Sequence, residues 1–141
     1  MMYTQPISGV NDYVYKNTGC NVQKTEQTDT SIYCLYSKDN SRECGIVSFD
    51  KKPFQRCIRR TLVPVGQDKY ATDFFQIGKD GKIFASFACG GINSDKFKTC
   101  IITINGTQYT KNIAKRPFLI VIELTTTSEQ LNTIPIIEFS N

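Results

Sequence analysis

The stretch that decides the fold is residues 100–113, which read CIITINGTQYTKNI. Two runs rich in Ile, Thr and Tyr flank Asn105-Gly106, a pair that readily adopts the positive φ angles of a two-residue hairpin turn. Such a turn predicts that Ile104 pairs with Thr107. In that register one face of the hairpin carries Cys100, Ile102, Ile104, Tyr109 and Ile113. We expect this face to be buried and the opposite face to meet water.

The same pattern recurs along the chain. Asp80-Gly81 lies between Phe74–Ile77 and Ile83–Phe87 and predicts a second two-residue hairpin. Phe118–Ile122 is apolar on both faces, which predicts a central strand covered on each side. Residues 21–30 are polar and are expected to form a loop. The other expected strands are Tyr13–Tyr15, Ser31–Tyr36, Gly45–Phe49 and Ile134–Phe139.

Together these segments predict one all-β domain. With no helical crossover between the strands, an antiparallel β-sandwich or a squashed barrel is favoured. The chain has 141 residues, which is close to the usual size of a single domain. We expect residues 1–19 to be an N-terminal arm and residues 20–141 to be the folded domain.

One segment departs from the β pattern. Apolar or small side chains recur at helical spacing, at Phe54, Cys57, Ile58, Thr61 and Leu62. This periodicity predicts a short amphipathic helix over residues 51–62. Its outer face would carry Lys52, Arg56, Arg59 and Arg60, with Lys51 beside them. These five cations form our candidate binding site for a phosphate, heparin or an acidic partner; the alternative is a solvated face whose side chains cover apolar surface.

Six cysteines are many for a chain of this length. They are Cys20, Cys34, Cys44, Cys57, Cys89 and Cys100. No two are close enough to form a Cys-x-x-Cys pair, and the chain has no histidine, so a metal site is not expected. We predict about three disulfides and hence an oxidising compartment. The sequence does not select among the fifteen possible pairings, although Cys34 with Cys44 and Cys89 with Cys100 lie on neighbouring segments that could be hairpin partners. Buried free thiols are the alternative.

Catalysis is constrained by the absence of histidine. It removes the Ser-His and Cys-His arrangements on which most acyl-transfer hydrolases depend. Paired carboxylates, as in a glycosidase, are the main chemistry left. The candidates are Glu43, Asp50, Asp73, Glu123 and Glu138. Glu123 follows an apolar run, and we expect it to face outward at the end of its strand. We therefore predict a protein that is not an enzyme and has no cofactor.

Charge and targeting signals set further limits. The net charge is +4, which is modest, so nucleic acid is not an expected partner. No apolar stretch is long enough to span a membrane. Residues 1–6 lack the features of a signal peptide, so secretion would need a leader removed earlier or another export route. Asn105-Gly106-Thr107 matches the glycosylation sequon, which makes Asn105 a glycosylation candidate.

These observations favour a secreted interaction module, such as a pathogen effector or surface antigen that binds a host protein. A second hypothesis is a structural subunit of an extracellular filament or virion, assembled as a homo-oligomer by strand addition. A third is a small glycosidase-like enzyme. The stretch from Phe87 to Ile104 resembles the closing strands of the six-cysteine surface-antigen sandwiches of apicomplexan parasites. The chain lacks the closely spaced cysteines of those domains, and no family is assigned.

Overall fold

The computed structural model describes residues 4–38, 42–66, 68–127 and 134–141, and in this part of the chain strands dominate. The elements in chain order are β1 (Gln5–Pro6), η1 (Ile7–Gly9), α1 (Val10–Thr18), β2 (Asn21–Gln27), β3 (Ser31–Ser37), β4 (Cys44–Lys52), β5 (Arg56–Val63), β6 (Ala71–Lys79), β7 (Lys82–Gly91), β8 (Thr99–Ile104), β9 (Thr107–Asn112), β10 (Phe118–Thr127) and β11 (Ile136–Ser140).

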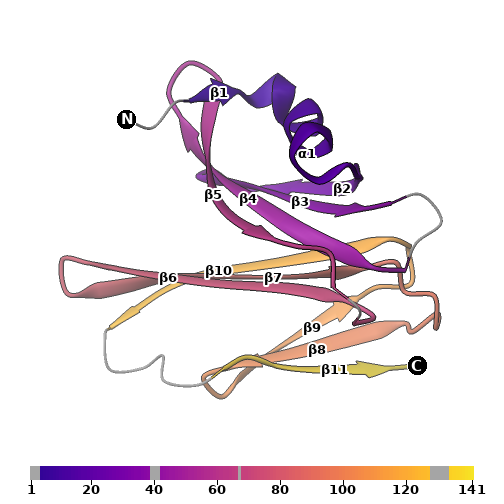
Figure 1. Ribbon diagram of the computed structural model, residues 1–141. Coiled ribbons are helices and arrows are strands. Elements are labelled where there is room, and N and C mark those ends of the chain that lie inside the picture. Colours follow the sequence, from indigo (N-terminus) through magenta and orange to yellow (C-terminus); the bar gives the residue numbers. More distant parts are fainter. Residues whose placement is uncertain (1–3, 39–41, 67, 128–133) are drawn as a thin grey trace.

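The strands form three antiparallel sheets that stack on one another. Sheet A has the order β1-β5-β4-β3-β2, sheet B the order β10-β7-β6, and sheet C the order β11-β8-β9. Figure 1 shows α1 over the outer face of sheet A, with sheet B in the middle and sheet C on the far side. The prediction of an all-β antiparallel fold is confirmed, and the sandwich has one sheet more than the two of a simple sandwich.

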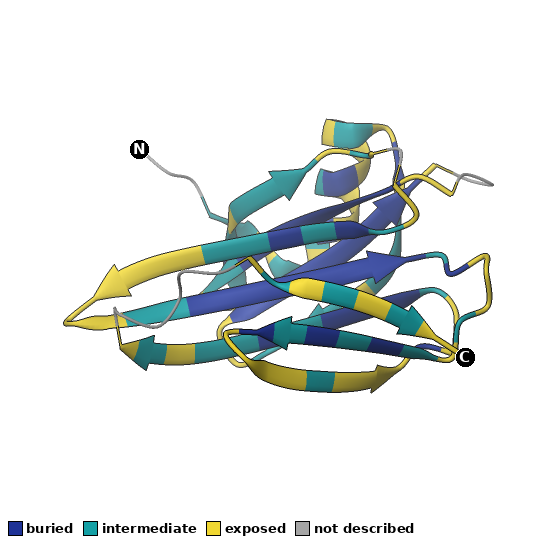
Figure 2. Cartoon of the chain, turned by 90° about the horizontal axis from the view of Figure 1, so that it is seen from below, coloured by how far each residue is buried: buried dark blue, intermediate teal, exposed yellow. Residues whose placement is uncertain are grey.

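Three apolar cores separate the four layers. Helix α1 and sheet A enclose Val14, Ile32 and Phe49, and sheets A and B enclose Leu35, Ile46 and Leu119. The largest core, between sheets B and C, contains Phe87, Ile102, Ile104, Ile113, Phe118, Ile120 and Ile122. Buried residues fill the middles of the strands, and exposed residues mark the hairpin ends (Figure 2). Sheet B is therefore covered on both faces.

Both predicted hairpins are confirmed. Ile104 pairs with Thr107 across Asn105-Gly106, and Ile102 pairs with Tyr109. Lys79 pairs with Lys82 across Asp80-Gly81. All four turn residues have positive φ, between 51° and 82°, as two-residue turns of this kind require. Local turn chemistry was thus sufficient to set these registers.

Strand β10 corrects one expectation. Its Phe118, Ile120 and Ile122 face sheet C, while Leu119 and Val121 pack in the core with sheet A, so both faces are covered as predicted. Within sheet B, however, β10 pairs with β7 alone and forms one edge. The prediction of a central strand is therefore wrong. Apolar residues on both faces of a strand show that sheets pack on both faces, but they do not show that the strand is hydrogen-bonded along both edges.

The helix predicted over residues 51–62 is wrong. This segment is the end of β4, a three-residue turn and β5. The register shifts between Ser48 and Phe49, and this bulge leaves Arg60 without a direct partner on β4. A bulge places successive side chains on one face, so Arg60 and Thr61 both point toward sheet B. Because of the bulge, the side chains of β5 do not alternate regularly between the two faces, and their spacing in the sequence resembles that of a helix.

The short helix lies instead at residues 10–18. Val10 and Val14, four residues apart, are buried against sheet A. Gly19 ends the helix with a φ of 72°, and its N–H donates to the Tyr15 carbonyl at 2.8 Å. The predicted strand over Tyr13–Tyr15 is therefore wrong. Most of the described part of residues 1–19 is packed on its own chain, as β1, η1 and α1.

The predicted loop over residues 21–30 is also wrong for most of its length. Residues 21–27 form β2, which pairs with β3 at the edge of sheet A. Its residues are exposed or half-buried, and the segment therefore carries the polar side chains that suggested a loop.

The disulfide prediction is wrong, because all six cysteines are free and buried. Cys34 lies in the core under α1 and Cys44 in the core between sheets A and B, so sheet A separates the two. Cys89 and Cys100 face each other between sheets B and C, and their mutual hydrogen bond and burial raise the pKa of the Cys89 thiol. The thiols fill the cores as small apolar groups. Without disulfides, secretion stays a prediction that has lost its main support.

Candidate functional site

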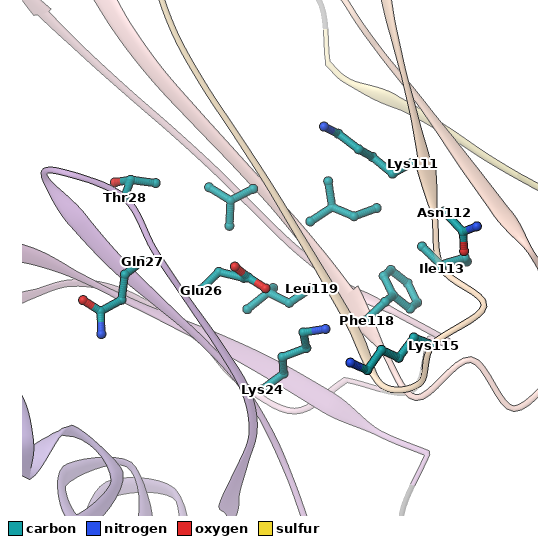
Figure 3. A pocket seen from close by; sticks show the side chains of 12 residues that line it. Lys24, Glu26, Gln27, Thr28, Lys111, Asn112, Ile113, Lys115, Phe118 and Leu119 are labelled. Carbon is teal, nitrogen blue, oxygen red and sulfur yellow. The ribbon is translucent and has the colours of Figure 1, made fainter.

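A groove opens where one edge of each sheet comes to the same side of the molecule. Strand β2 of sheet A forms one wall, the segment from β9 of sheet C to residue 115 forms the other, and β10 of sheet B is the floor (Figure 3). The volume of the groove is about 470 Å³. Its lining consists of Lys24, Glu26, Gln27, Thr28, Lys111, Asn112, Ile113, Lys115, Phe118, Leu119, Ile120 and Val121.

The floor of the groove is an open strand edge. On one side β10 pairs with β7 from Phe118 through Thr127. On its other side, in the part of the chain that the structure describes, no backbone hydrogen bond reaches Phe118–Val121 from another element. An edge strand of an antiparallel sheet directs the N–H and C=O groups of alternate residues outward. The groove therefore presents backbone donors and acceptors beside buried apolar side chains.

The walls carry an excess of positive charge. Lys24 projects from β2, and Lys111 and Lys115 project from the opposite wall; Glu26 is the acid among the lining residues. Figure 3 shows the side chains of Lys24 and Lys115 extending toward one another across the groove. The ion pairs found among the described residues join Arg60 to Asp50 and Lys69 to Asp95, so they do not neutralise these lysines.

The wall that carries Lys115 is held in place by a small network. Ile113 N–H donates to the Lys98 carbonyl at 2.9 Å. The side chain of Asn93 donates to the Ile113 carbonyl at 3.0 Å and to the Phe97 carbonyl at 2.8 Å. Ile113 is also buried in the core between sheets B and C, so these contacts anchor the backbone two residues before Lys115.

A second polar centre lies inside the molecule, between sheets A and B. The side chain of Arg60 is 5% exposed and forms a 2.8 Å ion pair with Asp50. Its guanidinium group also donates to the hydroxyl groups of Ser31, Tyr33 and Ser86 at 3.0–3.2 Å. The ring of Phe75 lies 4.8 Å from the guanidinium carbon. The bulge in β5 thus converts a predicted surface cation into a buried link between two sheets.

Three of the five candidate carboxylates join this interior region. Glu123 accepts a 2.5 Å hydrogen bond from the Tyr33 hydroxyl, so the expectation that it faces outward is wrong. Burial, and secondarily the hydrogen bond to Glu123, raise the pKa of Tyr33. Asp73 accepts a hydrogen bond from Thr61, which also contacts Ser48 at 2.5 Å. Each carboxylate is engaged by a neighbouring side chain, which favours a structural role.

The other two carboxylates and the sequon lie elsewhere. Glu43 is exposed just before β4, and Glu138 is exposed on β11. Asn105 is exposed at the turn between β8 and β9. Its glycosylation stays a prediction.

The five cations of the candidate basic site do not share one face. Arg60 is interior, Lys51 donates to the Thr28 carbonyl at 2.6 Å, and Arg56 donates to the Thr4 hydroxyl and carbonyl at 2.5 and 2.6 Å. Lys52 and Arg59 are exposed. The structure therefore keeps four of them around the β4–β5 hairpin and removes Arg60 from the surface.

Sequence reasoning missed the groove entirely. Its residues come from two regions far apart in the chain, 24–28 and 111–121, and they meet only because the three sheets stack with β2, β10 and β9 on one side. The available signal was the doubly apolar run of β10, read together with lysines on both flanking strands. No helix in the described ranges is both long and apolar enough to cross a bilayer. No protein-family model, curated protein or solved structure matches the chain.

Proposed function

We propose that this protein is a non-enzymatic interaction module that binds an extended, acidic segment of a partner protein along the edge of β10 at Phe118–Val121. The observation that carries the proposal is the groove itself, in which an unpaired strand edge lies between two walls that bear Lys24, Lys111 and Lys115. The partner segment would add a fourth strand to sheet B.

Strand addition suits this edge for a backbone reason. An incoming extended segment satisfies the outward N–H and C=O groups of β10, and such main-chain bonds give affinity for many sequences. Specificity then comes from the alternate side chains, which point toward the two walls. The apolar floor excludes water from the new hydrogen bonds, which strengthens them.

The charge of the walls selects for an acidic segment. Its alternate side chains would point to Lys24 on one side and to Lys111 or Lys115 on the other. Carboxylates at these positions would meet opposite charge on both walls, whereas a basic segment would be repelled. Glu26 reduces this preference on the β2 wall without cancelling it, since three cations line the groove with this one acid.

The two alternatives have less support. A structural subunit assembled by strand addition could use the same edge, but pairing of identical edges would bring the lysines of two copies together. A glycosidase-like enzyme needs two carboxyl groups that face a substrate. Asp50, Asp73 and Glu123 are instead engaged by Arg60, Thr61 and Tyr33.

The test uses the full chain and a strand-length peptide that alternates Glu and Val. Nuclear magnetic resonance would follow the titration. We expect saturable shifts of the backbone amide resonances of residues 118–121, and weaker binding at high salt. The same peptide with alternate amides N-methylated should not bind, because it cannot donate to β10. A Lys-Val peptide is the charge control.

Matched variants separate the groove from general charge. Lys24→Glu with Lys111→Glu should weaken binding about tenfold or more. Lys79→Glu with Lys82→Glu, at the distant β6–β7 hairpin, changes the net charge equally and should have little effect. Equal binding of the N-methylated peptide would exclude strand addition, and equal losses in both double variants would exclude the groove.

A further inference from the structure

The hairpin between β4 and β5 presents a phenylalanine to solvent. Its turn consists of Pro53, Phe54 and Gln55, and Lys52 pairs with Arg56 across it. The side chain of Phe54 is 94% exposed, the highest value among the large exposed hydrophobic residues of the described chain. In Figure 1 the hairpin curls up beside β1, at the end of sheet A that points away from sheets B and C.

Neither packing nor turn geometry accounts for a phenylalanine at this position. Phe54 has a φ of 65° and Gln55 a φ of 57°, both in the left-handed region. That region favours Gly, Asn and Asp, and a bulky side chain there is a strained outlier. Since the ring also buries almost no surface, it contributes little to folding. A role in binding explains its presence better.

Cations lie on both strands of the hairpin that carries the exposed ring. Lys52 and Arg59 are exposed, and Lys51 and Arg56 hydrogen-bond to the neutral oxygens of Thr28 and Thr4, which leaves their charge uncompensated. Asp50, the acid of the same hairpin, is 43% exposed and is paired with Arg60. Asp29, in the adjacent turn between β2 and β3, is exposed. The four cations therefore outnumber the unpaired acid on this side.

The hairpin is also held firmly. Ile7 N–H donates to the Gln55 carbonyl at 2.9 Å, and Lys51 N–H donates to the Thr30 carbonyl at 2.8 Å. Arg56 binds Thr4 through two nitrogens. The turn is thus tied to β1 on one side and to the β2–β3 turn on the other, so little ordering would be needed when it binds.

We infer that this hairpin docks on the surface of a bilayer that contains anionic lipids. An aromatic ring at a projecting turn can enter the boundary between headgroups and acyl chains without a preformed pocket. Lys and Arg beside it attract the anionic headgroups, and each contributes to binding near the surface. The contact is peripheral and is separate from the groove on β10. Membrane binding can therefore be tested independently of the proposed function.

The test exploits the absence of tryptophan from the chain. Phe54→Trp places one tryptophan at the turn, where the side chain packs against nothing that the larger ring would disturb. We expect its fluorescence to shift to the blue, and to be quenched by lipids brominated in the acyl chain, with vesicles of equal parts phosphatidylcholine and phosphatidylserine. Pure phosphatidylcholine vesicles should give neither change.

Two variants test the ring and the charge by co-sedimentation with the same vesicles. Phe54→Asn should reduce the partition coefficient roughly tenfold or more. Asn suits a positive φ, so this variant should unfold at the same or a higher denaturant concentration, which separates lost binding from lost folding. The double variant Lys52→Glu with Arg59→Glu should abolish binding to the mixed vesicles, because it replaces two cations near the membrane surface with acids.

The β6–β7 hairpin provides the control. It carries Ile77, which is 53% exposed, with Lys79 and Lys82 nearby. Ile77→Asn and Lys79→Glu with Lys82→Glu should leave vesicle binding unchanged. The inference is overturned if no vesicle binds, if both hairpins contribute equally, or if heparin or a soluble acidic protein binds while the tryptophan stays in water. The last result would assign the hairpin to a polyanion or protein partner instead.

Discussion

Arg60 illustrates how one residue can change from surface to interior through a local irregularity. It occupies the extra position of a bulge in β5 and points into the space between sheets A and B. There it is paired with Asp50, bonded to three hydroxyl groups and packed against two rings, with its Nε lacking a hydrogen-bond partner. A buried charge is tolerated only when it is paired in this way.

The variant Arg60→Met tests this role. It leaves Asp50, Tyr33 and Ser86 without their common donor, so we expect the free energy of unfolding to fall by roughly 2–4 kcal/mol. Urea titration followed by circular dichroism gives the value. Lys52→Met, which removes an exposed cation, should change it by less than about 0.5 kcal/mol. Similar losses in the two variants would mean that the interior network adds nothing to stability.

Such residues limit what sequence can predict about the site. The cationic segment over residues 51–60 was visible in the sequence, but the bulge that separates Arg60 from the other four cations was not. A bulge is set by packing across sheets, and it leaves no turn residue in the sequence as a marker. Glu123 is a similar case, because its hydrogen bond comes from Tyr33, which is far away in the chain.

At the level of single elements, a helix or strand could be predicted from the sequence when the interactions that determine it are local. The hairpins at Asp80-Gly81 and Asn105-Gly106 could be predicted with their registers, since two adjacent residues decide each turn. Helix α1 could have been found from its valines four residues apart and Gly19 beyond its end. The edge position of β10 could not, because it depends on which other strands join its sheet.

Gly90 in β7 shows how closely these elements approach. A Cβ atom built on Gly90 would lie 2.9 Å from Leu35 Cδ1 and 2.9 Å from the Phe118 carbonyl oxygen. Gly90→Ala should therefore force sheets A and B apart locally and lower the free energy of unfolding by about 1–3 kcal/mol. Gly66→Ala is the control, since no atom outside its chain neighbours lies within 4 Å of its added Cβ. A small, equal effect of both substitutions in urea titrations would show that the sheet contact is not tight.

At the scale of the whole molecule, three cores take the place of covalent cross-links. Each cysteine lies in one of these cores, and the six thiols behave as small apolar side chains. The number of cysteines in a sequence does not distinguish this arrangement from disulfides. Whether two thiols can pair depends on which of them meet in space: Cys89 and Cys100 meet between sheets B and C, whereas Cys34 and Cys44 lie in different cores.

These buried thiols and phenols predict a loss of stability at alkaline pH. Burial raises the pKa of Cys34 from 9.0 to about 11 and that of Tyr36 from 10.0 to about 12. Both groups are neutral below their unfolded pKa values, so their contribution is complete below about pH 9 and is lost as the pH rises toward 11–12. Full ionisation would cost roughly 2–3 kcal/mol per group. The denaturant concentration at the midpoint of unfolding should stay constant from pH 7 to 9 and decrease above pH 9.

The control for this prediction is Cys34→Ala, which removes one of the titrating groups. It should be less stable at neutral pH, because a buried side chain is truncated, but its stability should decline less steeply between pH 9 and 11. An unchanged slope would mean that Cys34 does not titrate in this range.

The lysines along the groove have one more consequence, which concerns self-association. An open strand edge is a template for pairing with any other open edge, including that of a second copy, and unchecked pairing leads to aggregates. Two copies that aligned their β10 edges would each bring Lys24, Lys111 and Lys115 to the seam. The resulting repulsion would oppose this pairing and would leave the groove open to a partner of opposite charge.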